Sequence, residues 1–530
     1  MNLNNLYNFK NSIRHFLNID SLNYPNLEGD EVFSVSELSW TKPISFRVLK
    51  DGDKYRTIKL PNILSFVRAY YYYKDLPNFD DLETFGSRHR RLTVNLETGD
   101  FITGEYDRQI EGDLMKLCLY DSLINIDIRE YYGKIYTHHL DLETMDGRKL
   151  VDNVLSGLNN GRTGGILMGN YLSLFFAESI LSKISSEIES RFREERLNVE
   201  FSYFSDNFYF FYNNDDKDLI ISIFDEILER YDFNRNEQKN KIWNYEKYNS
   251  YNILTRYWKS IVRHWNEQNI KFDKRNGESD VVISYRLTFL NRIIYRMSEL
   301  SDNKSKRILI NNFFKSKHFQ TTVFNKYEAR SYNYHQFCYL LKLSPESLLY
   351  TSYLFSNWVY FDNSKIQSFL ELRYSESLNK SLNDEQLYYY FALKIYEFED
   401  ALRKESEKVV NSNNQILISY YLRDGYFESD LLNTLKEKTD EQYWFQSYHL
   451  ILYSHDLMND LDSSIEKYLL PKKTLDSERT TVLKRKDRYL TFYKENLSDE
   501  KPIILDIPDV VSNIRQYLEA RWEETNFAWE

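Results

Sequence analysis

Cysteine is scarce in this sequence, with only Cys118 and Cys338 among 530 residues. Neither cysteine lies at the spacing of a zinc-binding pair, and two isolated thiols are typical of a reducing compartment. No apolar run approaches the roughly 20 residues that cross a bilayer, and the polar N-terminus lacks the apolar segment of a signal peptide. We therefore expect a cytoplasmic protein with no membrane partner.

Positive charge is also in short supply. The formal net charge is −11 and the pI is near 5.5. This balance argues against a broad basic surface that holds nucleic acid through its phosphates. It still allows a narrow site in which a bound metal ion supplies the positive charge.

Aromatic residues, in contrast, are abundant, with 45 Tyr and 34 Phe available for burial. A chain of this length is expected to hold two or more domains. A polar stretch at residues 269–277 marks a boundary. We expect a mostly helical α+β protein with one domain at 1–255, a connecting segment at 256–279 and an α-helical domain at 280–530.

The N-terminal part mixes strand and helix signals. Residues 44–49 and 55–60 flank the turn residues 51–53, which predicts a β-hairpin. An aromatic helix through Tyr70–Tyr73 follows. A further amphipathic helix is predicted at 219–231.

Two carboxylates stand at the ends of predicted strands. Asp127 ends the apolar run 123–128, and a helix is expected to begin near Arg129. Asp206 lies at the tip of an aromatic hairpin, YFSDNFYFF. Between them a helix is predicted at 167–188, entered through glycines. Two acids on adjacent strand ends are what a two-metal phosphoryl-transfer site requires, although two unrelated turn acids would give the same spacing.

The C-terminal part shows helical periodicity throughout. Apolar residues recur on single helix faces, at Leu287, Leu290, Ile294, Met297 and Leu300, and again at Leu387, Phe391, Ile395, Phe398 and Leu402. These successive amphipathic helices predict a repeat-like helical array, although no fixed repeat period is visible.

Five segments resemble the motifs of reverse transcriptases and stand in the same order. They are the fingers hairpin (Lys50–Gly52 with RTIKLPN at 56–62), motif A (IDIREYY, 126–132), motif B (GILMGNYLS, 165–173), motif C (FSDN, 204–207) and motif D (NEQK, 236–239). The form IREYYGKIYTHHL at 128–140 most resembles the AbiK-type abortive-infection reverse transcriptases of bacteria. The resemblance covers about residues 24–245 by motif, and the rest by helicity only.

The resemblance implies a fingers and palm domain followed by a helical repeat-like domain. It also implies an antiphage DNA polymerase that adds deoxynucleotides without a template and starts on its own tyrosine. The implied cofactor is Mg²⁺ or Mn²⁺. The implied partners are deoxynucleoside triphosphates, a covalently attached single-stranded DNA product and further copies of the chain, in the bacterial cytoplasm.

Site roles follow from the same resemblance. Asp127 and Asp206 would hold the catalytic metals, with the Ile128 carbonyl as an additional ligand. Asn207 occupies the position of the second motif C acid and would offer an oxygen to metal or water. Lys239 would neutralise or protonate the leaving pyrophosphate.

Nucleotide binding is assigned by the motifs to four residues. Tyr132 would sit under the sugar and exclude a 2′-hydroxyl. Lys50 and Arg56 would reach the triphosphate, and Gly169 would contact the nucleotide from motif B. Without the resemblance, each of these residues would be interpreted as an ordinary core, hairpin or helix-entry residue.

Two departures from the family pattern bear on the activity. Asn207 removes one negative charge from motif C, which would weaken Mg²⁺ binding. Leu167 and Met168 stand where motif B usually has Pro-Gln. Because the Gln lies near the templating base pair, its loss argues against ordinary template copying.

Three other functions are compatible with the sequence. The first is a templated reverse transcriptase of another bacterial defence type. The second is a catalytically inactive palm that serves as an interaction scaffold, for which Asn207 is the best support. The third is a ribonuclease of the Arg-x4-6-His kind, suggested by Arg330 and His335, although one such match is expected by chance.

Composition does not identify the priming tyrosine, because the chain has 45 tyrosines. A primer must reach the palm and then move away with the strand, which favours a mobile segment. Tyr24, next to Pro25 and among polar residues, fits this requirement best. Tyr7, on an amphipathic N-terminal helix, is the second choice.

Overall fold

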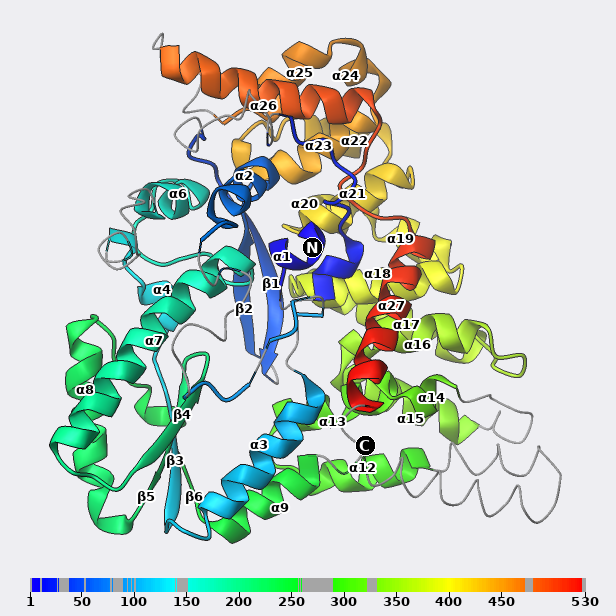
Figure 1. Ribbon diagram of the computed structural model, residues 1–530. Coiled ribbons are helices and arrows are strands. Elements are labelled where there is room, and N and C mark those ends of the chain that lie inside the picture. The colour runs from blue at the N-terminus through cyan, green and yellow to red at the C-terminus, as the bar shows by residue number, and fades with distance from the viewer. Residues whose placement is uncertain are drawn as a thin grey trace.

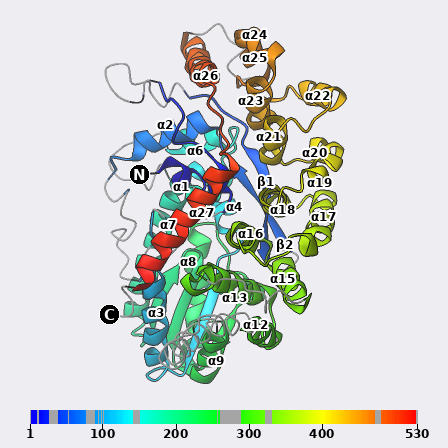
Figure 2. The same ribbon diagram turned by 90° about the vertical axis from the view of Figure 1, so that its right-hand side faces the viewer.

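The computed structural model shows an N-terminal half that packs along an arc of helices from the C-terminal half (Figures 1 and 2). The structure describes residues 2–9, 12–25, 27, 38–51, 54–76, 79, 89–92, 94–96, 98–99, 102–138, 140, 151–255, 257, 259, 289–321, 331–471 and 480–526. The predicted boundary at 269–277 lies outside these residues.

The N-terminal half combines helices with two small sheets. Its elements are α1 (Leu3–Tyr7), η1 (Ser12–Phe16), β1 (Ile44–Asp51), β2 (Lys54–Leu60), α2 (Ile63–Tyr73), α3 (Thr103–Lys116), β3 (Ser122–Asp127), α4 (Tyr131–Lys134), α6 (Val151–Leu158), α7 (Tyr171–Glu194), β4 (Glu200–Phe204), β5 (Asn207–Tyr212), η5 (Asn214–Asp216), α8 (Lys217–Arg230), η6 (Glu237–Lys239), β6 (Lys241–Trp243) and α9 (Tyr245–Thr255).

The described residues from 289 onward form helices and no strand, as predicted. These helices are α12 (Phe289–Ser298), α13 (Asn303–Lys315), α14 (Lys317–Gln320), α15 (Ser331–Leu343), η7 (Pro345–Ser347), α16 (Leu348–Ser356), α17 (Ser364–Asn379), α18 (Asn383–Ile395), α19 (Glu399–Lys404), α20 (Ser406–Asn411), α21 (Gln415–Arg423), α22 (Ser429–Lys436), η8 (Glu441–Tyr443), α23 (Trp444–Leu452), α24 (His455–Asn459), α25 (Leu461–Tyr468), α26 (Thr480–Ser498) and α27 (Ile507–Asn526).

The larger sheet has the strand order β4-β5-β3-β6, and every neighbouring pair is antiparallel. Alternate side chains of β5 face opposite sides of the sheet. On one side, Phe208 contacts Phe224 of α8, with ring centroids 5.1 Å apart. On the other side, Phe211 packs with Ile110 of α3 and Tyr248 of α9. The two central strands are therefore covered by helices on both faces.

Most predicted elements of the N-terminal half are confirmed, with shifted ends. The helix predicted from 167 begins at Tyr171, because Gly169 adopts a φ of +110° and Asn170 caps the helix by accepting the Ser173 N–H. The helix predicted near Arg129 is a single turn, α4, which follows Glu130 at a φ of 53°.

The apolar face predicted from Leu387 to Leu402 belongs to two helices. Helix α18 ends at Ile395, and α19 begins at Glu399. Glu397 between them has a φ of 60°. This left-handed conformation ends the first helix, and hydrophobic periodicity carries no sign of it.

The fingers hairpin β1–β2 is held by the start of α18. The Asn383 side-chain oxygen accepts the Arg47 N–H at 2.8 Å, and the Asp384 carboxylate accepts the Leu49 N–H at 2.7 Å. Both N–H groups belong to the free edge of a two-stranded sheet, which would otherwise lack partners. The C-terminal half therefore fixes the position of the fingers.

The N-terminal segment joins the two halves. The Leu505 N–H donates to the Phe16 carbonyl at 2.9 Å, and the Asn18 N–H donates to the Ile503 carbonyl at 2.7 Å. Figures 1 and 2 show the start of the chain between α7 and the C-terminal helices. The first 25 residues thus pack against both parts of the fold.

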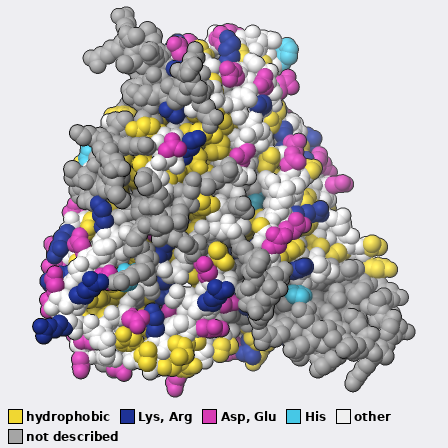
Figure 3. Space-filling model, viewed as in Figure 1, with side chains coloured by type: hydrophobic (Ala, Val, Ile, Leu, Met, Phe, Trp, Pro, Cys, Tyr) yellow, Lys and Arg dark blue, Asp and Glu magenta, His cyan; other side chains and the backbone are white. Residues whose placement is uncertain are grey.

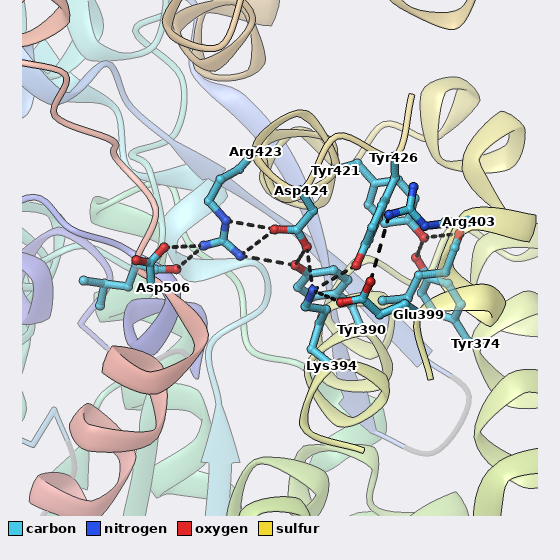
Figure 4. Close-up of polar contacts among 12 residues, drawn as sticks. Tyr374, Tyr390, Lys394, Glu399, Arg403, Tyr421, Arg423, Asp424, Tyr426 and Asp506 are labelled. Carbon is cyan, nitrogen blue, oxygen red and sulfur yellow. Dashed lines mark hydrogen bonds and ion pairs between the residues drawn. The ribbon is translucent and has the colours of Figure 1, made fainter. Parts of the chain in front are cut away.

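A polar network stabilises the helical array near the start of α27 (Figure 4). Arg423 forms ion pairs with Asp424 and Asp506, at 3.0 and 2.9 Å. Lys394 lies 3.3 Å from the Asp424 carboxylate, to which the Tyr390 hydroxyl donates at 2.6 Å. Each of these charges has a partner of opposite sign, so we assign the network to packing of α18, α21 and the segment before α27.

Charges of both signs are mixed on the described part of the face in Figure 3. Hydrophobic side chains gather at its lower end, over the region of α3 and α9. Exposed apolar residues of this region are Met115, Leu119, Ile242, Tyr245 and Ile253. The described part of this face carries no broad basic field, in agreement with the net charge.

The fold is α+β and mostly helical, as the sequence predicts. Among the described helices, none is both long enough and apolar enough to cross a membrane.

Candidate active site

A cavity of about 1430 Å³ lies between the palm sheet and the C-terminal helices. Its walls come from the ends of β3 and β5, from the hairpin β1–β2 and from α13, η7 and α18. Predicted site residues that line it are Lys50, Arg56, Asp127, Ile128, Tyr132, Gly169, Asp206, Asn207 and Lys239. The fold thus gathers the motifs A to D and the fingers hairpin around one space.

The two acids are brought together by strand register. Asp127, the last residue of β3, pairs directly with Asn207, the first residue of β5. The turn between β4 and β5 is Ser205-Asp206, and Ser205 adopts a φ of 52°. The Ile128 N–H donates to the Asp206 carbonyl at 2.9 Å. Asp127 and Asp206 therefore occupy the ends of adjacent strands at one edge of the cavity.

The two acids differ in how closely a positive charge approaches their carboxylates. Lys239 Nζ lies 2.8 Å from both carboxylate oxygens of Asp127, and the Asn236 amide donates to Asp127 at 3.0 Å. For Asp206, burial raises the pKa of the carboxyl, and the Asp127 charge raises it further, while Lys239 lowers it. Asn207 donates its amide to Asp206 at 3.3 Å.

The donor set suits a hard divalent cation. Asp127, Asp206 and Asn207 offer carboxylate and amide oxygens, which are the ligands that Mg²⁺ prefers. Burial and the Asp127 charge both raise the pKa of Asp206, and a bound cation would stabilise its charged form. Among the described residues no group of three or more His, Cys, Asp or Glu side chains gathers as a metal site. The residues present therefore fit Mg²⁺ or Mn²⁺ with few protein ligands.

The paired aromatics of motif A have different environments. Tyr131 is buried, and its hydroxyl donates to the Ala177 carbonyl at 2.6 Å. Tyr132 lines the cavity together with Ser205 and Asp206 of the acid-bearing turn. Burial raises the pKa of Tyr132, and the Glu178 and Asp206 charges raise it further. Tyr132 is therefore the aromatic ring that lies beside the acids.

Motif B places a backbone bend at the cavity. The φ of +110° at Gly169 lies in the region that favours glycine. Its carbonyl accepts the Phe9 N–H at 2.6 Å. Met168, which stands where the family has Gln, accepts from Arg56 Nη1 through its sulfur at 3.2 Å. The Met168 side chain thus contacts a fingers residue.

The fingers contribute positive charge opposite the acids. Burial lowers the pKa of the Arg56 guanidinium, while the nearby Asp206 charge raises it and the Arg307 charge lowers it. Arg307 of α13 also donates to the Lys50 carbonyl at 2.9 Å. Lys50, Arg56 and Arg307 therefore form a basic group across the cavity from the palm acids.

Several residues of the site were missed by the sequence analysis. Arg307, Asp384, Glu385 and Tyr388 line the cavity from the C-terminal half. No motif marks them, because their position depends on packing of α13 and α18 against the fingers. Asn236 lay within the quoted motif D, but only the structure shows that its amide contacts Asp127.

The two tyrosines predicted as primers do not line this cavity. The Tyr7 hydroxyl is buried and donates to the Pro61 carbonyl at 2.5 Å. The Tyr24 hydroxyl donates to the Ile19 carbonyl at 2.8 Å, and its ring stacks on Phe492. Priming from either residue would require the N-terminal segment to leave its packing site.

The ribonuclease alternative gains no support from the geometry. Arg330 lies outside the described residues, and His335 is exposed on α15. His335 does not line the cavity with Asp127 and Asp206.

No model of a known protein family matches the chain, and no curated protein sequence matches it. Similar solved structures include telomerase from Candida albicans in complex with a TWJ fragment of telomeric RNA, at 12% identity and a TM-score of 0.30, covering 67% of this chain and 65% of that chain. Apo telomerase from Candida tropicalis is 11% identical with a TM-score of 0.31, covering 83% of this chain and 70% of that chain. The chain thus spans slightly less than two thirds of the Candida albicans chain.

The palm is reverse-transcriptase-like in its own geometry. A four-stranded antiparallel sheet carries Asp127 at the end of β3 and Asp206 in the adjoining hairpin turn. Helices cover both faces of this sheet, and the fingers hairpin stands across the cavity. The weak overall similarity to the telomerases adds no weight to this description.

Proposed function

We propose that this chain is a metal-dependent DNA polymerase of the AbiK type, which adds deoxynucleotides without a template and starts on one of its own tyrosines. The observation that carries the proposal is the meeting of Asp127 and Asp206 at one cavity edge, opposite Lys50 and Arg56. Paired acids facing cations are suited to holding metal ions and a triphosphate together.

Each residue has a task in this proposal. Asp127 and Asp206 would hold Mg²⁺ or Mn²⁺, which when bound would activate the attacking hydroxyl and offset phosphate charge. Arg56 and Lys50 would neutralise the triphosphate of the incoming nucleotide. Lys239, already beside Asp127, would hold a proton near the leaving pyrophosphate.

Two features support synthesis without a template. The C-terminal half contributes α13, η7 and α18 to the walls of the cavity, and a primer-template duplex would have to share the space with them. Met168 replaces the motif B Gln and bonds to Arg56, so no amide from this position faces a templating base.

The role in defence against phage rests on the resemblance of residues 128–140 alone. We expect phage to form fewer plaques on a strain that carries the gene than on a strain that carries the Asp127→Ala variant. Equal plating of a broad phage panel on both strains would contradict this role without bearing on the polymerase.

The decisive experiment uses purified full-length protein with labelled deoxynucleotides and Mg²⁺ or Mn²⁺, without template or primer. We expect label that runs with the protein on a denaturing gel and that is absent from Asp127→Ala. Incorporation only after addition of a primer-template would indicate a templated reverse transcriptase. No incorporation under either condition would indicate a scaffold.

A further inference from the structure

A second recess lies next to the reaction cavity and is strongly basic. It has a volume of about 590 Å³ and is lined by parts of β1, β2, α13, α15, η7, α17 and α18. Its charged residues are the cations Arg47, Lys306, Arg307, Lys342, Arg373 and Lys380 and the carboxylates Glu376 and Glu385. Six cations against two carboxylates leave a surplus of four positive charges, in a chain whose formal net charge is −11.

Some of these cations form ion pairs within the described part of the protein, and others do not. Arg373 and Lys380 form ion pairs with Glu376. Within the part of the chain that the structure describes, Lys306 and Lys342 form no ion pair. Lys342 is exposed and Lys306 is half-buried, so both can reach a ligand in the recess. A cleft lined by one sign of charge focuses its field and raises the local concentration of counter-ions, which here are anions.

The recess continues from the reaction cavity. Leu49, Arg307, Pro345 and Glu385 line both spaces. Arg307 stands at the junction, within the electrostatic reach of Arg56 on one side and beside Lys306 on the other. A row of cations therefore leads from the palm acids, past Arg56 and Arg307, to Lys306 and Lys342.

The ligand that matches this row is a linear polyanion. The cations of the reaction cavity are enough to neutralise the phosphates of a free nucleotide. A strand that extends from the acids carries one further phosphate for every nucleotide added. The recess is lined by the fingers hairpin and by helices α17 and α18, and Figure 2 shows these elements side by side. Its volume falls in the range of small-ligand sites, about 300–1,000 Å³, and suits a short stretch of one strand.

We infer that this recess binds the phosphate backbone of single-stranded nucleic acid as the strand leaves the reaction cavity. The inference rests on the proposed polymerase function. Lys306 and Lys342 are its specific determinants, and Arg307 links it to the active site. Because phosphate contacts carry no sequence information, binding is expected to be indifferent to base identity.

The test measures binding without catalysis. Full-length protein is titrated with a fluorescent single-stranded oligodeoxynucleotide in chelator, without nucleotides, and anisotropy is recorded at several salt concentrations. A variant with Lys306→Glu and Lys342→Glu is compared with a control carrying Lys317→Glu and Lys365→Glu, two exposed lysines outside both cavities. Both variants change the net charge equally.

We expect the recess variant to bind at least about tenfold more weakly than the control, with a salt slope shallower by roughly 1.4, or 0.7 for each of two phosphates. Equal affinity of the two variants would overturn the inference. So would a recess that binds inorganic pyrophosphate but not the oligonucleotide. If charge reversal lowers the melting temperature, the pair Lys306→Gln and Lys342→Gln replaces it.

The outcome is separable from that of the proposed function. Failure of the wild-type protein to incorporate nucleotides would contradict the polymerase but leave oligonucleotide binding measurable. Loss of binding in the recess variant, with Asp127→Asn binding normally, would locate the strand in the recess and not at the acids.

Discussion

Lys239 Nζ lies 2.8 Å from each carboxylate oxygen of Asp127. A metal ion held by Asp127 would therefore share this carboxylate with the ammonium, and metal and lysine would compete for the same negative charge. Lys239→Gln removes the competitor. We expect tighter Mn²⁺ binding, measured by electron paramagnetic resonance titration.

The same variant separates metal binding from proton transfer. At saturating metal, Lys239→Gln is expected to lose about 10²-fold or more in incorporation rate, because a general acid is missing. Lys241→Gln is the matched control, since Lys241 is exposed two residues further on and does not line the cavity. Wild-type metal affinity in Lys239→Gln would show that the ion pair does not limit metal binding.

The two palm acids should matter more for incorporation than the neighbouring Asn207. Asp127→Asn and Asp206→Asn each remove one charge without changing shape, and each should lower incorporation by more than about 100-fold, since several kcal/mol of charge stabilisation are lost. Asn207→Ala should cost less, because the amide is neutral. Asp218→Asn, an exposed acid of α8, controls for the loss of one charge.

Asn207→Asp restores a second acid to motif C. It should lower the Mg²⁺ concentration that gives half-maximal incorporation. An unchanged metal requirement would indicate that Asn207 does not face the metal, despite its register opposite Asp127.

Sugar choice is expected to depend on the ring of Tyr132 and not on its hydroxyl. Tyr132→Ala should admit ribonucleotides, whereas Tyr132→Phe, which loses only the hydroxyl, should keep the preference for deoxynucleotides. Competition between labelled ribo- and deoxynucleotides measures both variants. Unchanged discrimination in Tyr132→Ala would place the sugar contact elsewhere.

The contact between Asp384 and the Leu49 N–H of the fingers hairpin should make stability depend on pH. Burial raises the pKa of Asp384 to about 7, and the neighbouring Glu385 also raises it, while the Leu49 N–H and Arg307 lower it. The folded state then holds a proton that the unfolded chain releases near pH 4. Stability from this group is complete below pH 4 and is lost as the pH rises to about 7, by at most about 1.4 kcal/mol per pH unit.

Asp384→Asn tests this dependence, because its oxygen still accepts the Leu49 N–H. The melting temperature of the variant should fall less than that of the wild type between pH 5 and pH 8. Parallel curves for the two proteins would assign the pH dependence to other groups.

The priming residue can be found without assumption. Nuclease treatment of labelled protein followed by mass spectrometry identifies the tyrosine that carries the first nucleotide. If Tyr24 is the primer, Tyr24→Phe should abolish protein-linked label while its ring still stacks on Phe492. Full labelling of Tyr24→Phe would exclude it, and Tyr7→Phe is tested in the same way.

Local signals in the sequence, together with the motif resemblance, predicted most of the palm, although strand β6 was missed. Alternating aromatics predicted β4 and β5, and strand-ending acids predicted Asp127 and Asp206 at one site, which the register of β3 with β5 brings together. The contribution of α13 and α18 could not be predicted. Arg307 and Asp384 reach the cavity through contacts with Lys50 and Leu49, more than 250 positions earlier in the chain, and no local pattern encodes such distant pairing.

The pairing of Phe16 with Leu505 has a consequence for biosynthesis. Ribosomes add roughly 5–20 residues per second, so the N-terminal segment waits on the order of a minute before residues 503–505 are made. During that interval Phe16 and Leu17, both fully buried in the finished protein, have no place to pack. Until residues 503–505 have been made, the buried surface around Phe16 and Leu17 is incomplete, so the two halves can complete their packing only late in synthesis.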